Sequence, residues 1–151
     1  MSKSNAFEND LVALIFQNAG AANIGDATGL RGSTVAGSLY IALHTADPGE
    51  AGDQTTNEIS TAAYGQYVRQ AVARSAAGFT LTGTGGVTLA AAVNFSQMTS
   101  GTGGAVATHF SIGTSMSGVG KVLYKGAISP TITVNNGVTP QLTTATTVTE
   151  D

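Results

Sequence analysis

The sequence predicts a mainly β fold: an antiparallel sandwich, jelly-roll-like, with one N-terminal helix. Short runs of alternating apolar and polar residues recur along the chain, and this period of two is typical of half-buried strands. Clusters of Gly, Asn, Asp and Pro separate the runs at short intervals, as in antiparallel sandwiches and barrels. One stretch close to the N-terminus has the spacing of an amphipathic helix.

Residues 1–20 contain this predicted helix. Ser4 is placed to cap its N-terminus, and residues 18–20 supply a stop. Its apolar residues recur at spacings of three and four: Phe7, Leu11, Leu14 and Ile15. Such a stripe packs on another surface, and two alternatives are open. Either it covers the sheet of the same subunit, or residues 1–20 form an arm that docks on a neighbouring subunit.

The first strand is predicted at residues 39–44, after a Gly-, Ala- and Asn-rich connection at residues 21–37. Its alternation predicts a half-buried strand with Leu39, Ile41 and Leu43 on one side and Tyr40, Ala42 and His44 on the other. Asp47-Pro48-Gly49 then ends it, because proline has no N–H for a sheet and glycine adopts a positive φ at little cost.

Further strands are predicted at residues 66–74, 78–82, 87–95, 109–113 and 121–127. Residues 84–86 have the composition of a hairpin turn. Pro130 marks a sheet edge or the start of a strand, because it cannot donate to a ladder. Residues 131–134 and 138–142 are predicted to form a hairpin around an Asn-Gly pair.

A chain of 151 residues fits one domain. We expect a single structural domain over residues 1–151. Its β-sandwich body spans residues 38–142, between the N-terminal helix or arm and a C-terminal arm at residues 143–151, which alternatively forms a last strand. Charged residues make up only 10% of the chain and hydrophobic residues 42%. So neutral a surface indicates coverage by partners or by copies of the chain itself.

Composition also excludes several classes of protein. The net charge is −3 and the six basic residues are scattered, which argues against nucleic-acid binding. There is no cysteine, so disulfides and thiolate metal sites are excluded. No apolar stretch approaches the ~20 residues of a membrane span, and no signal peptide opens the chain. We therefore expect a protein made and kept in the cytoplasm until it is assembled into a larger structure.

Four carboxylates lie close together between Asp47 and Glu58, with Glu50 and Asp53 between them. Calcium takes six to eight oxygen ligands from such loops, but the spacing does not match an EF-hand. The sequence therefore predicts a solvated acidic loop, and pairing of its carboxylates with Arg69 or Arg74 is an equal alternative. A cation site in this loop is the minor alternative.

No reaction centre is recognisable, so the sequence predicts no enzyme, no catalytic residue, no cofactor and no metal site. His109 and Ser111 lie two residues apart on one strand face, but no nucleophile elbow surrounds any serine. We expect both His44 and His109 to be structural. The glycine runs at residues 83–86 and 101–104 lack the strand and helix context of phosphate-binding loops and are interpreted as turns.

Aromatic residues and arginine favour protein interfaces because they bring large contact area with few rotamers to lose. The predicted interface residues are Phe7, Leu11, Asp47, Pro48, Glu50, Tyr64, Tyr67 and Arg69. The alternative for the tyrosines is half-burial in their own sheet.

Several stretches between the helix and residue 142 are similar to a known family. They are residues 39–50, Asn57-Glu58-Ile59, Tyr64 with Tyr67-Val68-Arg69, Val93-Asn94-Phe95, residues 108–113, residues 123–126, Pro130 and Asn136-Gly137. Together they resemble a family of small structural proteins of tailed bacteriophages, described as virion, head-decoration or tail-fibre-like proteins. The chain departs from that family by extra residues at 22–32, which affects where its N-terminal helix is placed.

The resemblance implies a virion structural protein, with no catalytic residues to carry over. The first hypothesis is a capsid decoration or cement protein that bridges major capsid proteins and associates with copies of itself. The second is a tail or head-fibre component for host attachment, for which exposed aromatic-rich loops are expected, and aromatic residues are 6% here. A remote third is a small carbohydrate-binding or hydrolase module, which would need paired carboxylates on opposed strands or a histidine site.

Overall fold

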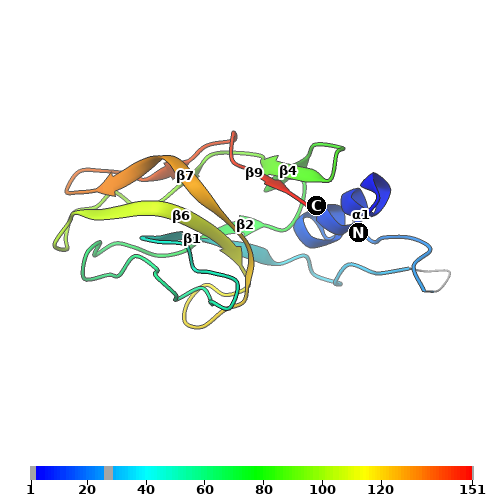
Figure 1. The fold of residues 1–151 in the computed structure, drawn as a ribbon, viewed down its shortest axis with the longest axis horizontal. Helices are drawn as coiled ribbons and strands as arrows, with labels where there is room; N and C mark the ends of the chain where they lie inside the picture. The colour runs from blue at the N-terminus through cyan, green and yellow to red at the C-terminus, as the bar shows by residue number, and fades with distance from the viewer. Residues whose placement is uncertain (1–2, 26–28, 151) are drawn as a thin grey trace. The chain divides into compact units, whose positions relative to one another are not determined.

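The computed structural model describes residues 3–25 and 29–150 of the chain (Figure 1). Their elements are α1 (Asn5–Gln17), β1 (Ser38–His44), β2 (Gln70–Ala73), β3 (Phe79–Leu81), β4 (Gly86–Leu89), β5 (Val93–Asn94), β6 (Ala105–Gly113), β7 (Val122–Val134), β8 (Gln141–Leu142) and β9 (Thr147–Thr149). Strand pairs β1–β6, β6–β7, β3–β4 and β4–β9 are antiparallel. The predicted fold class, mainly β and antiparallel with one N-terminal helix, is confirmed.

The chain forms two compact units. Unit 1 comprises residues 1–38, 72–92 and 142–151, and unit 2 comprises residues 39–71 and 93–141. The single-domain organisation with terminal arms stays a prediction. Residues 1–2, 26–28 and 151, which belong to the predicted arms and to the connection before the first strand, lie outside the described residues.

In unit 1 the helix begins and ends where its sequence predicts. Ser4 is the N-cap, and its hydroxyl accepts a hydrogen bond from the Phe7 N–H at 3.4 Å. Asn18 ends the helix in the left-handed conformation, with φ of 57°. No helix of the described residues is long and apolar enough to cross a membrane.

The helix packs on β3 and β4 of its own chain, but with a different face from the predicted one. Val12 and Phe16 are buried, and the Phe16 ring meets Phe79 edge-on at 5.0 Å, whereas Phe7 is 37% exposed. Leu11, Leu14 and Ile15, the rest of the predicted stripe, are only partly buried.

Polar anchors set this rotation of the helix. The Asn9 side chain donates to the Gly83 carbonyl at 3.1 Å and accepts from the Gly85 N–H at 2.6 Å. Gln17 donates to the Phe79 carbonyl at 2.8 Å. These hydrogen bonds fix the face that meets the sheet, and hydrophobic periodicity does not register them.

The sheet of unit 1 has the order β3-β4-β9. The turn between β3 and β4 is confirmed, with Leu81 opposite Val87. Two alternatives were open for the C-terminal tail, a last strand or an extended arm. Residues 147–149 form a strand, β9, which pairs with β4. The single strand predicted at residues 87–95 is wrong: it is split into β4 and β5, because β4 pairs with β3 and β9 whereas β5 pairs with β8.

Unit 2 contains β1, β6 and β7 of the sheet ordered β2-β1-β6-β7, and Figure 1 shows β6 and β7 running side by side. Ile41 lies opposite Ile112 and Leu43 opposite Phe110. The half-buried strand predicted at residues 39–44 is only partly correct, because Ala42 and His44 are also fully buried. The chain after β1 folds back beside it, and the Ile59 N–H donates to the Leu43 carbonyl at 3.0 Å.

Four other strand predictions differ from the structure. The strand predicted at residues 66–74 is reduced to β2. The strands predicted at residues 121–127 and 131–134 are parts of one strand, β7, which begins at Val122, ends the sheet and contains Pro130, in agreement with the predicted edge position. β6 begins at Ala105, four residues earlier than expected.

The hairpin predicted between residues 131–134 and 138–142 is wrong, because β7 pairs with β6 and β8 pairs with β5. The turn at residues 135–137 is bonded to residues 98–104 instead. The Gly137 N–H donates to the Met98 carbonyl at 2.8 Å, and Asn135 Oδ1 accepts from the Gly104 N–H at 2.9 Å. Contacts with a distant segment thus override the local hairpin signal.

The packing of α1 predicts a large stability difference between two phenylalanines. Phe16→Ala removes a fully buried ring and should lower the free energy of unfolding by about 3–5 kcal/mol. Phe7→Ala, at the exposed position of the same helix, is the matched control and should cost about 1 kcal/mol or less. Urea unfolding followed by circular dichroism measures both. Equal losses for the two variants would contradict this packing.

Candidate functional site

The candidate site is a contact surface built around the loop that joins β6 to β7. The connection comprises residues 114–121, and its part at residues 114–120 is named the 114–120 loop. Two buried side chains from other parts of unit 2 hold it: Arg69, 3% exposed, and Gln54, fully buried. A loop anchored in this way presents its tip in a fixed conformation, which lowers the entropy cost of a contact.

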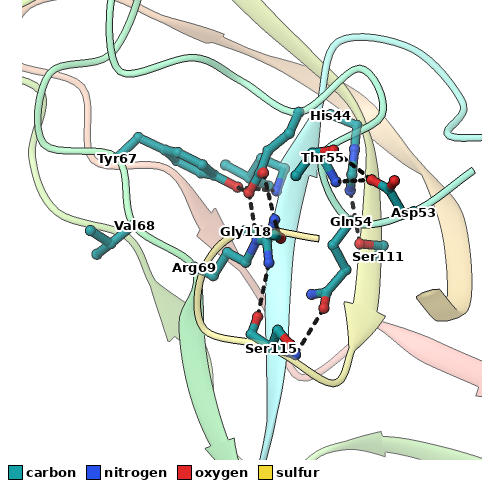
Figure 2. Close-up of polar contacts among 12 residues, drawn as sticks. His44, Asp53, Gln54, Thr55, Tyr67, Val68, Arg69, Ser111, Ser115 and Gly118 are labelled. Atoms are coloured by element: carbon teal, nitrogen blue, oxygen red, sulfur yellow. Dashed lines mark hydrogen bonds and ion pairs between the residues drawn. The ribbon is translucent and has the colours of Figure 1, made fainter. Parts of the chain in front are cut away.

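Arg69 joins the 114–120 loop to Glu58, and Figure 2 shows its contact with Ser115 in the loop. Its Nε and Nη2 donate to the two oxygens of the Glu58 carboxylate, each at 2.7 Å. Nη1 donates to the Ser115 carbonyl at 3.0 Å, and Nη2 also donates to the Gly118 carbonyl at 2.9 Å. The bidentate pair fixes the guanidinium plane, and that plane in turn fixes the two carbonyls of the loop.

Tyr67 completes the polar cluster. Its hydroxyl donates to Glu58 Oε1 at 2.8 Å and accepts from the Leu43 N–H at 3.0 Å. Burial raises the pKa of the Tyr67 hydroxyl well above its usual range, so the hydroxyl stays protonated and donates. The hydrogen bond to Glu58 raises the pKa of Arg69. The cluster is therefore a buried ion pair whose charges compensate each other. The hydrogen bond from the Leu43 N–H to the Tyr67 hydroxyl connects it to β1.

Gln54 lies inside the base of the 114–120 loop. Its backbone N–H donates to the Gly120 carbonyl at 3.0 Å, and its Oε1 accepts from the Ser115 N–H at 2.8 Å. A Cβ atom on Gly113 would lie 2.2 Å from Gln54 Cδ, and one on Gly120 would lie 2.0 Å from Gln54 Oε1. Glycine is thus required at both positions to admit the amide, whose Nε2 has no hydrogen-bond partner in the described part of the chain.

Three large apolar side chains are exposed on the outer side of this arrangement. Met116 is 50% exposed and Val119 is 76% exposed on the loop, and Val68, next to Arg69 in sequence, is 51% exposed. Val68 points away from the Arg69 cluster in Figure 2. Val68 and Met116 line one pocket together with Glu58, Tyr67, Arg69, Ser117 and Gly118. We name Val68, Met116 and Val119 the contact surface.

The acidic residues separate into different contacts. Asp47 and Glu50 pair with Lys125 at 2.9 and 3.1 Å, a partner that the sequence did not indicate, and Glu58 pairs with Arg69, one of the two alternative partners. The Gly49 N–H, followed by Lys125, lowers the pKa of Asp47. In the described ranges no three acidic or histidine side chains converge on a possible metal position.

Asp53 and Arg74 make other contacts. Hydrogen bonds from the Thr55 side chain and backbone lower the pKa of Asp53. Arg74 does not meet the acidic loop. In unit 1 its guanidinium donates to the Leu14 and Ile15 carbonyls at 2.5 and 2.7 Å.

The two histidines make separate contacts, and His109 does not pair with Ser111 two residues away. Ser111 bonds instead to His44, at 2.8 Å from Nε2, while His109 Nδ1 lies 2.9 Å from the Thr108 hydroxyl. His44 and Ser111 resemble a base and a nucleophile in geometry. Both are fully buried, so no substrate reaches them in this conformation.

The structure places the predicted interface residues in three groups. Tyr64, Tyr67 and Arg69 are buried in unit 2, where the two tyrosine rings lie 5.7 Å apart and the Tyr64 hydroxyl donates to the Ser96 carbonyl. Asp47 and Glu50 are exposed around a buried Pro48, and Phe7 and Leu11 lie on α1 in unit 1. The interface role of all eight stays a prediction.

Sequence reasoning did not single out Gln54 or the 114–120 loop. A signal was present, because Met116 and Val119 are apolar residues inside a Ser- and Gly-rich turn, where solvent exposure is the rule. Gln54 carried no such signal. Its role depends on Gly113 and Gly120, which are distant in sequence.

Comparison with known proteins identified one family. The family model described as Podophage GP4 fiber I protein gp80 matches residues 2–149. This match covers α1, both units and the contact surface. A search of curated proteins found no match.

The Arg69–Glu58 pair predicts an asymmetric response to substitution. Arg69→Met leaves the Glu58 carboxylate without its cation and two loop carbonyls without their donor, and it should lower the free energy of unfolding by about 3–5 kcal/mol. Lys125→Met breaks an exposed ion pair and is the control, with a much smaller expected loss. Adding Glu58→Gln to Arg69→Met should restore part of the stability, measured by urea unfolding. No rescue, or equal losses for the Arg69 and Lys125 variants, would argue against a buried compensated pair.

The fit of Gln54 predicts energetic coupling with Gly113. Gly113→Ala places a methyl group against the amide and should destabilise unit 2 by about 1–3 kcal/mol. In a Gln54→Ala background the same substitution should cost at least about 1 kcal/mol less, because the clashing atoms are gone. Thermal unfolding of the four proteins in this cycle gives the coupling energy, with Ser117→Ala as the exposed-loop control. Additive effects would refute the fit.

Proposed function

The chain belongs to the family of the podophage GP4 fiber I protein gp80, and on this premise we propose that it is a fibre subunit of a bacteriophage particle. The observation that most strongly supports this proposal is the extent of the family match, residues 2–149. A match of this extent includes the elements that build the contact surface. The family supports a role as a structural part of the virion.

Composition and fold support a structural role. Only 10% of the residues are charged, and a neutral surface is suited to close packing against other subunits. The contact surface adds three exposed apolar side chains on a loop held by Arg69 and Gln54. We propose that copies of the chain are among its partners.

The chemistry of unit 2 supports a non-enzymatic role. Glu58, the carboxylate nearest the pocket, already accepts three hydrogen bonds from Arg69 and Tyr67. A general acid or base must instead exchange a proton with a substrate within hydrogen-bond reach. Glu58 therefore serves to position Arg69.

Capsid decoration is the second candidate function. The low charge of the chain also suits a protein that covers a shell of major capsid proteins. The description of the family supports the fibre role more directly. In either case the proposed location is the virion, after assembly in the host cytoplasm.

Immunogold labelling of intact phage particles tests the fibre role. An antibody raised against this chain should label fibres, while an antibody against the major capsid protein labels the shell as a control. Quantitative mass spectrometry of the same particles should give far fewer copies of this chain than of the major capsid protein. Even labelling of the shell, with copies comparable in number to the capsid protein, would overturn the fibre role in favour of decoration.

A further inference from the structure

His44 lies at the base of the loop formed by residues 45–57, named the 45–57 loop. Backbone hydrogen bonds close this base, from Thr45 N–H to the Asn57 carbonyl at 2.8 Å and from Ile59 N–H to the Leu43 carbonyl at 3.0 Å. The fully buried His44 ring adds two side-chain contacts, with Nδ1 2.9 Å from the Thr56 carbonyl and Nε2 2.8 Å from the Ser111 hydroxyl. It thereby joins the loop to β6.

These partners select one form of the imidazole. The Thr56 carbonyl can only accept, so Nδ1 carries a hydrogen and donates to it. In the neutral ring Nε2 then accepts from the Ser111 hydroxyl. Protonation would turn Nε2 into a second donor, require the Ser111 hydroxyl to reorient, and place a positive charge at a site without solvent.

The electrostatic surroundings favour the neutral ring. Burial is the main reason that the pKa of His44 is lowered from its usual value. Arg69, from the segment before β2, and His109, from β6, act in the same direction. The Thr56 carbonyl and the Glu58 carboxylate act in the opposite direction and do not reverse the shift.

The 45–57 loop and its C-terminal neighbour carry the groups that hold the 114–120 loop. Gln54 bonds to Ser115 and Gly120, and Glu58 orients the Arg69 guanidinium that bonds to Ser115 and Gly118. Displacement of residues 54–58 would therefore remove both anchors at once. The contacts of His44 at the base of the 45–57 loop are therefore linked, through these anchors, to the position of Met116 and Val119 in the 114–120 loop.

We infer that His44 is an acid-sensitive latch in unit 2: its protonation opens the 45–57 loop and so releases the 114–120 loop. This inference does not depend on the fibre role, because it rests on contacts within one chain. Protonation of the His44 ring is the event that opens the latch. The result of opening is a contact surface that is ordered at neutral pH and loosened in acid.

The sign and size of the effect follow from proton linkage. In the open loop the ring is solvated and its pKa returns to about 6.5, whereas in the closed loop it stays neutral to lower pH. Above about pH 6.5 the latch contributes fully to stability, and as the pH falls the open state gains protons that the closed state does not bind. The opening equilibrium constant should thus rise about tenfold per pH unit until the closed-state pKa is reached.

Hydrogen exchange followed by mass spectrometry on the full chain tests the latch. After correction for intrinsic exchange rates, peptides covering residues 45–58 and 113–121 should exchange faster near pH 5 than near pH 7.5, by up to about thirtyfold. Peptides from β3 and β4 in unit 1 should keep their protection. An unchanged rate in the two loops, or an equal increase throughout the chain, would overturn the inference.

Matched histidine variants assign the effect to one residue. His44→Asn retains a donor for the Thr56 carbonyl but cannot become charged, so its loops should lose the acid response. His109→Asn should keep it. Should His44→Asn fail to fold, NMR titration of the wild-type imidazoles decides: the ring of His44 must remain neutral in the closed protein below pH 6.5 and titrate together with loop opening. A His44 ring that is charged while both loops stay protected contradicts the latch.

Discussion

The buried ion pair between Arg69 and Glu58 is the interaction on which the arrangement of unit 2 depends. Removing a guanidinium from water is costly unless all its neighbours are hydrogen-bond acceptors, and here a carboxylate and two carbonyls fill that role. The pair connects the segment before β2, the end of the 45–57 loop and the 114–120 loop. Apolar packing within the sheet supplies most of the burial, but it leaves the paths of these loops undetermined.

In unit 1, too, a few polar side chains determine how the elements pack. Asn9 and Gln17 decide which face of α1 meets the sheet, and Val12 and Phe16 then fill the space that this rotation leaves. In a chain with so little charge, each buried polar side chain has a large influence on geometry because an unsatisfied group is expensive. The hydrophobic residues provide stability, and the polar ones select the conformation.

This division explains what the sequence could predict. The helix limits, β1, the β3–β4 turn and the Glu58–Arg69 pair follow from local spacing, caps and charge. Non-local contacts govern the remainder: the Asn135 turn bonds to residues 98–104, β4 and β5 take different partners, and Gln54 meets Gly113 and Gly120. Of the candidate site, Arg69 and Tyr67 are recognisable from residue type, Met116 and Val119 carry a weak signal as apolar residues in a polar turn, and Gln54 emerges only from the three-dimensional contacts. The similarity to a phage structural family was detectable from short motifs, and the family match extends it over nearly the whole chain.

The anchors of the 114–120 loop have one property with an evolutionary consequence. Arg69 and Gln54 contact the loop through main-chain atoms alone, namely the carbonyls of Ser115, Gly118 and Gly120 and the N–H of Ser115. Replacing the side chains at positions 116, 117 and 119 would leave every one of these bonds intact. Substitutions at these three positions can therefore accumulate during evolution without loss of the hydrogen bonds that hold the loop.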